Sequence, residues 1–367
     1  MLYLTQFIIR ISHGKPEIRV FHHPALSLFC KNEETRKSGL QNLGLTSNPA
    51  IFEKAISSSS DYDADITELA KENLSNDVIF YRMAVKDIQQ AADILLPVYN
   101  EGVIGADGYV SLEVSPLLAL DTEGTVKQAL ELWKEVDRKN VMIKIPGTQP
   151  GLAAIKKTIS EGLNINVTLL FGLERYKKVA EAYIEGLEDR DAQGQSIKEI
   201  SSVASFFLSR IDVLLDPILE EKHLSELKGE VAIASAKKAY EIYKEVFSGE
   251  RWEKLAAKGA RPQRLLWAST SSKDPAFKDT KYVEALIGKD TVDTIPMETL
   301  DAYRDHGDPE NRLEIDLEGA TAILAQLHHA EIDLARLTQQ LEDEGIAKFN
   351  APYEKLLNAI EKQKHSA

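Results

Sequence analysis

The sequence predicts an α/β protein built as a (βα)8 TIM-type barrel with additional C-terminal helices. From residue 44 onward, short apolar runs alternate with longer amphipathic, charge-rich stretches, which is typical of parallel strands covered by helices. A chain of 367 residues suits a single decorated barrel of this kind. A doubly wound open sheet is the competing architecture, and it is disfavoured because no G-x-G-x-x-G or phosphate-loop motif follows any of the runs.

Seven short apolar runs are the expected strands of this barrel. In chain order they lie at residues 44–48, 109–114, 141–146, 165–171, 202–207, 264–269 and 291–296. Helical patterns separate them, as at 125–140 and 173–188. A barrel of eight strands needs one more strand, which we expect within residues 1–43, at 6–12 or at 17–23.

The expected domain organisation follows from the same pattern. Residues 1–43 form an atypical N-terminal segment that supplies the first strand, and residues 44–367 form a single barrel domain with a C-terminal helical extension. That extension, from Ala320 onward, carries no catalytic pattern. The sequence contains no internal repeat and no linker long enough to separate two domains.

Composition excludes several classes of function. A net charge of −14 argues against non-specific binding to nucleic acid or to an anionic membrane. No apolar run approaches the roughly 20 residues that span a bilayer, and the apolar start of the chain lacks the basic region of a signal peptide. The single cysteine, Cys30, allows no internal disulfide, so we expect a cytoplasmic protein.

Alternation within the expected strands separates an apolar face from a polar one. In residues 141–146, Val141, Ile143 and Ile145 lie opposite Lys144, because successive side chains of a strand point to opposite faces. Barrel interiors are usually filled by aliphatic side chains, so a polar inner face indicates a site. The alternative, an exposed face of an antiparallel sandwich, is disfavoured by the intervening helices. The polar positions of three runs are Ser111, Glu113, Ser115, Lys144, Asn164, Asn166 and Thr168.

Lys144 needs an explanation, because a charge in a buried strand is costly unless it is paired, neutralised or used. An ammonium group in an apolar strand loses solvation, and the neutral amine that this favours can attack a carbonyl to form a Schiff base. Glu113, on the neighbouring strand, can position a water molecule and transfer protons. A purely structural ion pair between Lys144 and Glu113 explains the same pattern, and the residues by themselves leave both interpretations open.

Six ordered segments resemble the signature segments of transaldolases, in the longer bacterial and plant-type branch. They read GLTSNPAIFEKAI, DGYVSLEVSP, VMIKIPGT, INVTLLF, ASFFLSRID and RPQRLLWASTSSKDP. The resemblance implies a class I aldolase-like barrel in the non-oxidative pentose phosphate pathway. The reaction would move a dihydroxyacetone unit reversibly from sedoheptulose 7-phosphate to glyceraldehyde 3-phosphate. It implies phosphorylated sugars as partners and no metal or organic cofactor, and we expect a monomer or a homodimer.

The resemblance also assigns roles to individual positions. Lys144 matches the Schiff-base lysine, and Glu113 and Thr168 match the pair that handles the catalytic water. Sugar-binding roles fall on two asparagines and on the wall of the sixth strand, and these positions are Asn48, Asn166, Ser205 and Phe207.

The implied phosphate site departs from the shorter branch of the family. Arg210 and Ser269 match the phosphate-binding positions. Where a second arginine would stand, this chain has Ser271, and Lys273 follows two residues later. We expect Lys273 to supply the second positive charge, as a point charge rather than a bidentate fork.

One family feature is missing. Transaldolases carry an aspartate on the first barrel strand, which acts as acid and base when the C–C bond breaks and forms. Residues 1–43 contain no aspartate, and their acids are Glu17, Glu33 and Glu34. The N-terminus is altered or mis-assigned, or Glu17 substitutes from the wrong end of the barrel. We expect reduced activity, with an impaired sugar-phosphate-binding barrel or a simple class I aldolase as alternatives.

Overall fold

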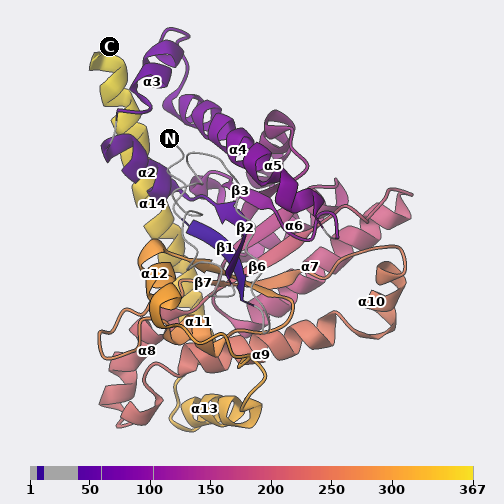
Figure 1. The fold of residues 1–367 in the computed structure, drawn as a ribbon, viewed down its shortest axis with the longest axis vertical. Coiled ribbons are helices and arrows are strands. Elements are labelled where there is room, and N and C mark those ends of the chain that lie inside the picture. The colour runs from indigo at the N-terminus through magenta and orange to yellow at the C-terminus, as the bar shows by residue number, and fades with distance from the viewer. Residues whose placement is uncertain (1–5, 12–39, 59, 102, 367) are drawn as a thin grey trace.

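The protein forms a closed barrel whose strands lie at the centre of the molecule, with helices around them (Figure 1). The computed structural model describes residues 6–11, 40–58, 60–101 and 103–366. The predicted barrel is confirmed, the open-sheet and sandwich alternatives are wrong, and the seven apolar runs form β2 to β8. The strands are β1 (Gln6–Ile11), β2 (Leu40–Thr46), β3 (Tyr109–Glu113), β4 (Val141–Pro146), β5 (Ile165–Leu170), β6 (Ser202–Phe207), β7 (Arg264–Ala268) and β8 (Thr291–Ile295).

β1 departs from the all-parallel order of a (βα)8 barrel. β2 to β8 are parallel in series, whereas β1 pairs antiparallel with both β2 and β8. It falls within 6–12, one of the two candidate segments, and the other candidate, 17–23, lies outside the described residues. An antiparallel strand can pair with the edge groups of both neighbours as a parallel strand can, so either direction closes the barrel.

The helices cover the outside of the barrel. The patterns at 125–140 and 173–188 form most of α5 and α7, and the tail is helical as expected. No helix within the described ranges is long and apolar enough to cross a membrane. The bounds are α2 (Pro49–Ser58), α3 (Asp63–Ala70), α4 (Asn76–Asn100), α5 (Thr122–Val136), α6 (Gln149–Ser160), α7 (Leu173–Ala192), α8 (Ser209–Glu221), α9 (Val231–Val246), α10 (Gly249–Ala256), α11 (Lys281–Ala285), α12 (Met297–His306), α13 (Leu317–His329) and α14 (Leu334–Ser366), with short 3-10 turns at Pro116–Leu118 and Ser225–Leu227.

Side chains of opposite character divide the barrel interior into two levels. Towards the start of the strands, an apolar cluster that includes Met142, Val203 and Val292 fills the interior. Two residues further along the same strands, the side chains become polar, as at Lys144 and Ser205. The apolar level therefore forms a floor, and the polar level lies towards the carboxyl ends of the strands, where barrel enzymes place their active sites.

The C-terminal helix α14 packs across the side of the barrel. Figure 1 shows it as the long yellow helix that runs from beside α12 to α3. It contacts α2, α3 and α4, which come from the first third of the chain. This long-range packing brings the middle of α14 close to the carboxyl ends of the strands.

Candidate active site

A cavity of about 350 Å³ opens at the carboxyl ends of the strands. It gathers nine of the ten site residues expected from the sequence, and the tenth, Glu113, contacts one of them directly. Positions far apart in the chain therefore lie around one space. The nine are Asn48, Lys144, Asn166, Thr168, Ser205, Phe207, Arg210, Ser269 and Lys273.

Lys144 and Glu113 form a buried ion pair. The two residues are in register on the adjacent parallel strands β3 and β4, and Lys144 Nζ lies 3.1 Å from Glu113 Oε2. Lys144 also donates a hydrogen bond of 3.2 Å to the carbonyl oxygen of Ser47. Burial raises the pKa of Glu113, and the charge of Lys144 opposes that shift only in part. The same contact that stabilises the pair also places a proton donor and acceptor beside the amine.

A chain of hydrogen bonds orients the amide of Asn166. Its Nδ2 donates to Ser111 Oγ at 3.0 Å, and its Oδ1 accepts from Ser205 Oγ at 2.7 Å. The three residues lie on β5, β3 and β6, so the barrel itself holds the amide in place. Thr168 Oγ1, in contrast, is buried without a hydrogen-bond partner among the described residues. Because an unpaired buried hydroxyl is costly, it indicates a position where water or a substrate hydroxyl binds.

Asn48 has a structural task as well as a place in the cavity wall. Its Oδ1 accepts a hydrogen bond of 2.9 Å from the backbone N–H of Ile51 in the first turn of α2. This is the geometry of a helix cap. The cap holds the side chain at the mouth of the barrel, where its Nδ2 can donate to a ligand.

A positive charge without a protein counter-ion lies on one side of the cavity. No carboxylate of the described residues pairs with Arg210, and its Nη1 is buried without a partner. Burial lowers the pKa of this guanidinium group, which lies 5.5 Å from the ring centre of Phe207. Ser269 Oγ lies 2.8 Å from Ser209 Oγ, and Lys273 Nζ donates to Ser271 Oγ at 2.5 Å. A partly buried, unpaired cation beside hydroxyl groups suits an anionic ligand.

Two backbone positions at the rim have left-handed conformations. Leu169, directly after Thr168, has a φ of 58°, and Ser269, directly after β7, has a φ of 59°. The ladder between β5 and β6 is irregular where Leu169 lies, between Val167 and Leu170. Such conformations cost non-glycine residues on the order of 1–3 kcal/mol and occur often at functional sites.

The sequence did not indicate the part of the wall that α14 supplies. Lys348, Phe349 and Pro352 line the cavity. Their spacing is that of an ordinary helix face, so it carries no chemical signal. Pro352, a proline inside a long helix, is the one local irregularity that could have drawn attention to this segment.

Asp293 is a buried carboxyl group that the sequence motifs also left unassigned. Its Oδ1 accepts a hydrogen bond of 2.9 Å from Thr270 Oγ1, and its Oδ2 is buried without a partner among the described residues. Burial raises its pKa to about 8. On β8 it alternates with Val292, which lies in the barrel floor, and Thr294, which lines the cavity. Asp293 therefore belongs to the opposite face of the strand, towards the helices.

Comparison with known proteins adds an independent finding. The profile of the family described as transaldolase/fructose-6-phosphate aldolase matches residues 33–360. The chain is 48% identical to the transaldolase of Trichodesmium erythraeum, over 89% of each chain. It is 48% identical to transaldolase 2 of Nostoc punctiforme, over 87% of each chain. It is 46% identical to the transaldolase of Saccharopolyspora erythraea, over 88% of this chain and 87% of that protein.

Proposed function

The chain belongs to the transaldolase/fructose-6-phosphate aldolase family and is a transaldolase, and we propose that its reaction proceeds through a Schiff base on Lys144. Transaldolases transfer a dihydroxyacetone unit reversibly from sedoheptulose 7-phosphate to glyceraldehyde 3-phosphate, in the non-oxidative pentose phosphate pathway. The observation that carries the proposal is the buried Lys144, which lies in the cavity beside Glu113.

The proposed chemistry assigns one step to each group around the amine. After Lys144 gives a proton to Glu113, its neutral amine attacks the ketone carbon of the donor sugar. Loss of water from the carbinolamine needs a proton on the leaving oxygen, and Glu113 and Thr168 supply it through a water molecule. The raised pKa of Glu113 suits this exchange, because a buried carboxyl group accepts a proton more readily than an exposed carboxylate does.

We further propose that Asn48, Asn166 and Ser205 bind the hydroxyl groups of the dihydroxyacetone unit, with Phe207 as an apolar wall. The hydrogen bonds between Asn166 and its serine neighbours support this assignment, because they orient the amide before the sugar arrives. Arg210, Ser269 and Lys273 are the proposed phosphate site. This places a local positive region within a protein of net charge −14.

Removal of the charge at Arg210 should weaken binding of phosphorylated substrates selectively. We expect Arg210→Ala to raise KM for fructose 6-phosphate by roughly 1.5–3 kcal/mol, or about 10- to 150-fold, because a charge-assisted hydrogen bond is lost. An unphosphorylated ketose should be affected little. Arg138→Ala is a matched control, since Arg138 pairs with Asp93 at the protein surface. Equal losses for both substrates would contradict the phosphate role.

Dependence on an acceptor separates a transaldolase from a simple class I aldolase. With fructose 6-phosphate alone, we expect release of glyceraldehyde 3-phosphate to stop after about one equivalent per active site. Addition of an aldose phosphate acceptor should restore turnover, because the acceptor removes the three-carbon unit from Lys144. Continuous release of dihydroxyacetone without an acceptor would identify an aldolase instead.

The remaining proposals concern the setting of the enzyme. We propose a cytoplasmic enzyme that is a monomer or a homodimer and binds no nucleic acid. The net charge of −14 and the single cysteine support these proposals. We also propose that the reaction uses no metal or organic cofactor, since an amine and a carboxyl group suffice for Schiff-base chemistry.

A further inference from the structure

The loop between β7 and α11, residues 269–280, carries much of the proposed phosphate site. Ser269, Ser271 and Lys273 of this loop line the cavity. Lys273 is otherwise exposed, and its Nζ is bonded only to Ser271 Oγ among the described residues. A long, flexible side chain on a loop can place its charge reliably only if the loop itself is fixed.

The start of the loop is fixed by two side-chain contacts. Thr270 Oγ1 donates to Asp293 Oδ1 on β8, at 2.9 Å. Ser269 Oγ lies 2.8 Å from Ser209 Oγ at the start of α8. Both contacts come directly after β7 and before Lys273, so they leave the far end of the loop to be held by other groups.

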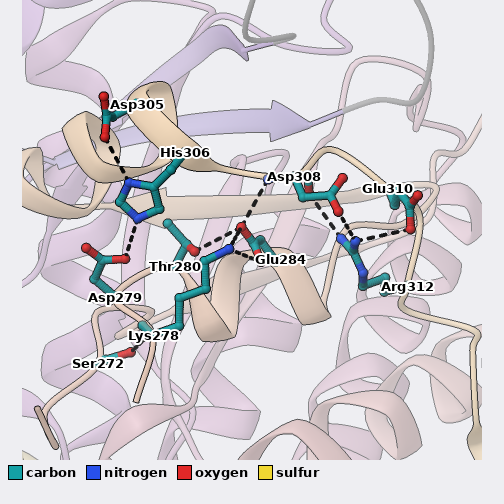
Figure 2. Close-up of polar contacts among 10 residues, drawn as sticks. All are labelled: Ser272, Lys278, Asp279, Thr280, Glu284, Asp305, His306, Asp308, Glu310 and Arg312. Carbon is teal, nitrogen blue, oxygen red and sulfur yellow. Dashed lines mark hydrogen bonds and ion pairs between the residues drawn. The ribbon is translucent and has the colours of Figure 1, made fainter. Parts of the chain in front are cut away.

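One tie at the far end is a carboxylate that accepts several hydrogen bonds (Figure 2). Glu284 of α11 accepts from Lys278 Nζ at 2.7 and 2.9 Å and from Thr280 Oγ1 at 2.9 Å. It also accepts from the backbone N–H of Asp308 at 3.0 Å, and Ser272 Oγ bonds the carbonyl oxygen of Lys278 at 2.6 Å. These contacts join the loop to α11 and to the segment after α12.

The other tie is His306, at the end of α12. Its Nε2 lies 2.8 Å from Asp279 Oδ1 of the loop, and its Nδ1 lies 3.1 Å from Asp305 Oδ2 (Figure 2). Carboxylate oxygens only accept hydrogen bonds, and a neutral imidazole has a single N–H. Both contacts are therefore favourable only when the ring is an imidazolium ion.

The charges around His306 agree with this protonation state. The hydrogen bond to Asp279 raises the pKa of His306, and that to Asp305 adds to the effect. These two aspartates are the charged groups that contact the ring among the described residues, and Lys278 and Glu284, drawn beside it in Figure 2, bond each other. A raised pKa means that the tie is complete below about pH 6.5 and is lost as the pH rises through the raised value.

We propose that His306 is a positioning residue for recognition of the substrate phosphate. As an imidazolium ion it fastens the far end of the 269–280 loop to α12 and so holds Lys273 at the cavity. Loss of the proton turns one of the two carboxylate contacts repulsive and so removes one of the two ties that hold that end of the loop. This inference rests on the proposed role of Lys273 in binding phosphate.

The test is the pH dependence of KM for fructose 6-phosphate in four proteins. In the unaltered enzyme, KM should rise between pH 6 and 9. His306→Ala should raise KM about two- to fivefold at pH 6, which is the size of effect that an exposed charged contact has. At pH 9, where His306 of the unaltered enzyme is neutral, the two proteins should have similar KM values. His306→Arg should keep KM low across the range, because arginine stays charged. Ionisation of the substrate phosphate also changes with pH, but it affects all four proteins equally. It therefore cancels when the KM of each variant is divided by the KM of the unaltered enzyme at the same pH.

His365→Ala is the fourth protein and the matched control. His365 is also an exposed histidine beside a carboxylate, Glu361, but it lies at the end of α14. Its profile should follow that of the unaltered enzyme. Asp279→Asn tests the same tie from the loop side and should give the same profile as His306→Ala. It provides the test if His306→Ala folds poorly.

Two results would overturn the inference. One is an unchanged ratio of KM between His306→Ala and the unaltered enzyme at every pH. The other is an equal change for an unphosphorylated ketose, which would indicate a general effect on folding rather than on phosphate recognition. A different result would show that the proposed function itself is wrong: borohydride would then trap no sugar on Lys144 in any of the proteins.

Discussion

Substitution of Lys144 by arginine should abolish the covalent intermediate and lower turnover by a factor on the order of 10⁴–10⁶, as removal of a catalytic nucleophile does. Arginine keeps a positive charge beside Glu113, so the buried pair survives. It cannot lose a proton at working pH, however, and so cannot attack a carbonyl. The variant should therefore fold normally and still bind phosphorylated sugar.

Borohydride reduction measures the intermediate directly. After incubation with fructose 6-phosphate, mass spectrometry of the unaltered enzyme should find a reduced sugar adduct on Lys144 and on no other lysine. The Lys144→Arg protein should carry none. Lys157→Arg, at a surface lysine paired with Glu161, is the matched control and should retain the adduct. A labelled site at any other lysine would falsify the assignment.

The second large effect concerns cleavage of the C–C bond. We expect this chain to form the Schiff base normally, yet to turn over about 10²–10⁴-fold more slowly than a transaldolase with the first-strand aspartate, because the described strands place no aspartate in the corresponding position. β1, Gln6–Ile11, contains no acidic residue, and Glu17 lies outside the described residues. Asp293 belongs to the strand face directed towards the helices, and Glu298 is the one carboxylate among the described residues that line the cavity.

Trapping and turnover should be measured side by side on this protein and on the Trichodesmium erythraeum transaldolase. With dihydroxyacetone itself, both should give a reduced three-carbon adduct, since this step requires no cleavage. With fructose 6-phosphate, the intact six-carbon adduct should be the species trapped on this chain at early times, before slow cleavage releases glyceraldehyde 3-phosphate and leaves the three-carbon adduct. Glu298→Gln shows whether that carboxylate takes over the missing role. Turnover equal to that of the relative would mean that another group supplies the acid and base.

A rescue experiment uses the register of β1. Because the strand is antiparallel, its first residue, Gln6, pairs with Thr46, which lines the cavity. This register places the backbone of position 6 at the cavity end of the barrel. Gln6→Asp should raise turnover and shift the trapped species from six carbons towards three.

The strands and their inward faces were determined by the sequence itself. Alternation has a period of two residues and depends on nothing but the local chain, so the apolar face of 141–146 could be assigned before any contact was known. When consecutive strands are parallel neighbours, Glu113 and Lys144 are expected on adjacent strands. The structure places them directly opposite each other in the register of β3 and β4. Fold and central pair were therefore predictable from local pattern and strand order.

Other features depended on contacts between distant segments, and these only the tertiary structure decided. The direction of β1 is one, because its hydrogen bonds can be satisfied in either orientation. The approach of Lys348 to the cavity is another, since a helix face at the end of the chain does not reveal which surface covers it. The tie between Asp279 and His306 joins a loop to a helix 27 residues later. Nothing in either segment alone indicates that tie, because an aspartate and a histidine on a surface have many possible partners until the barrel brings the two together.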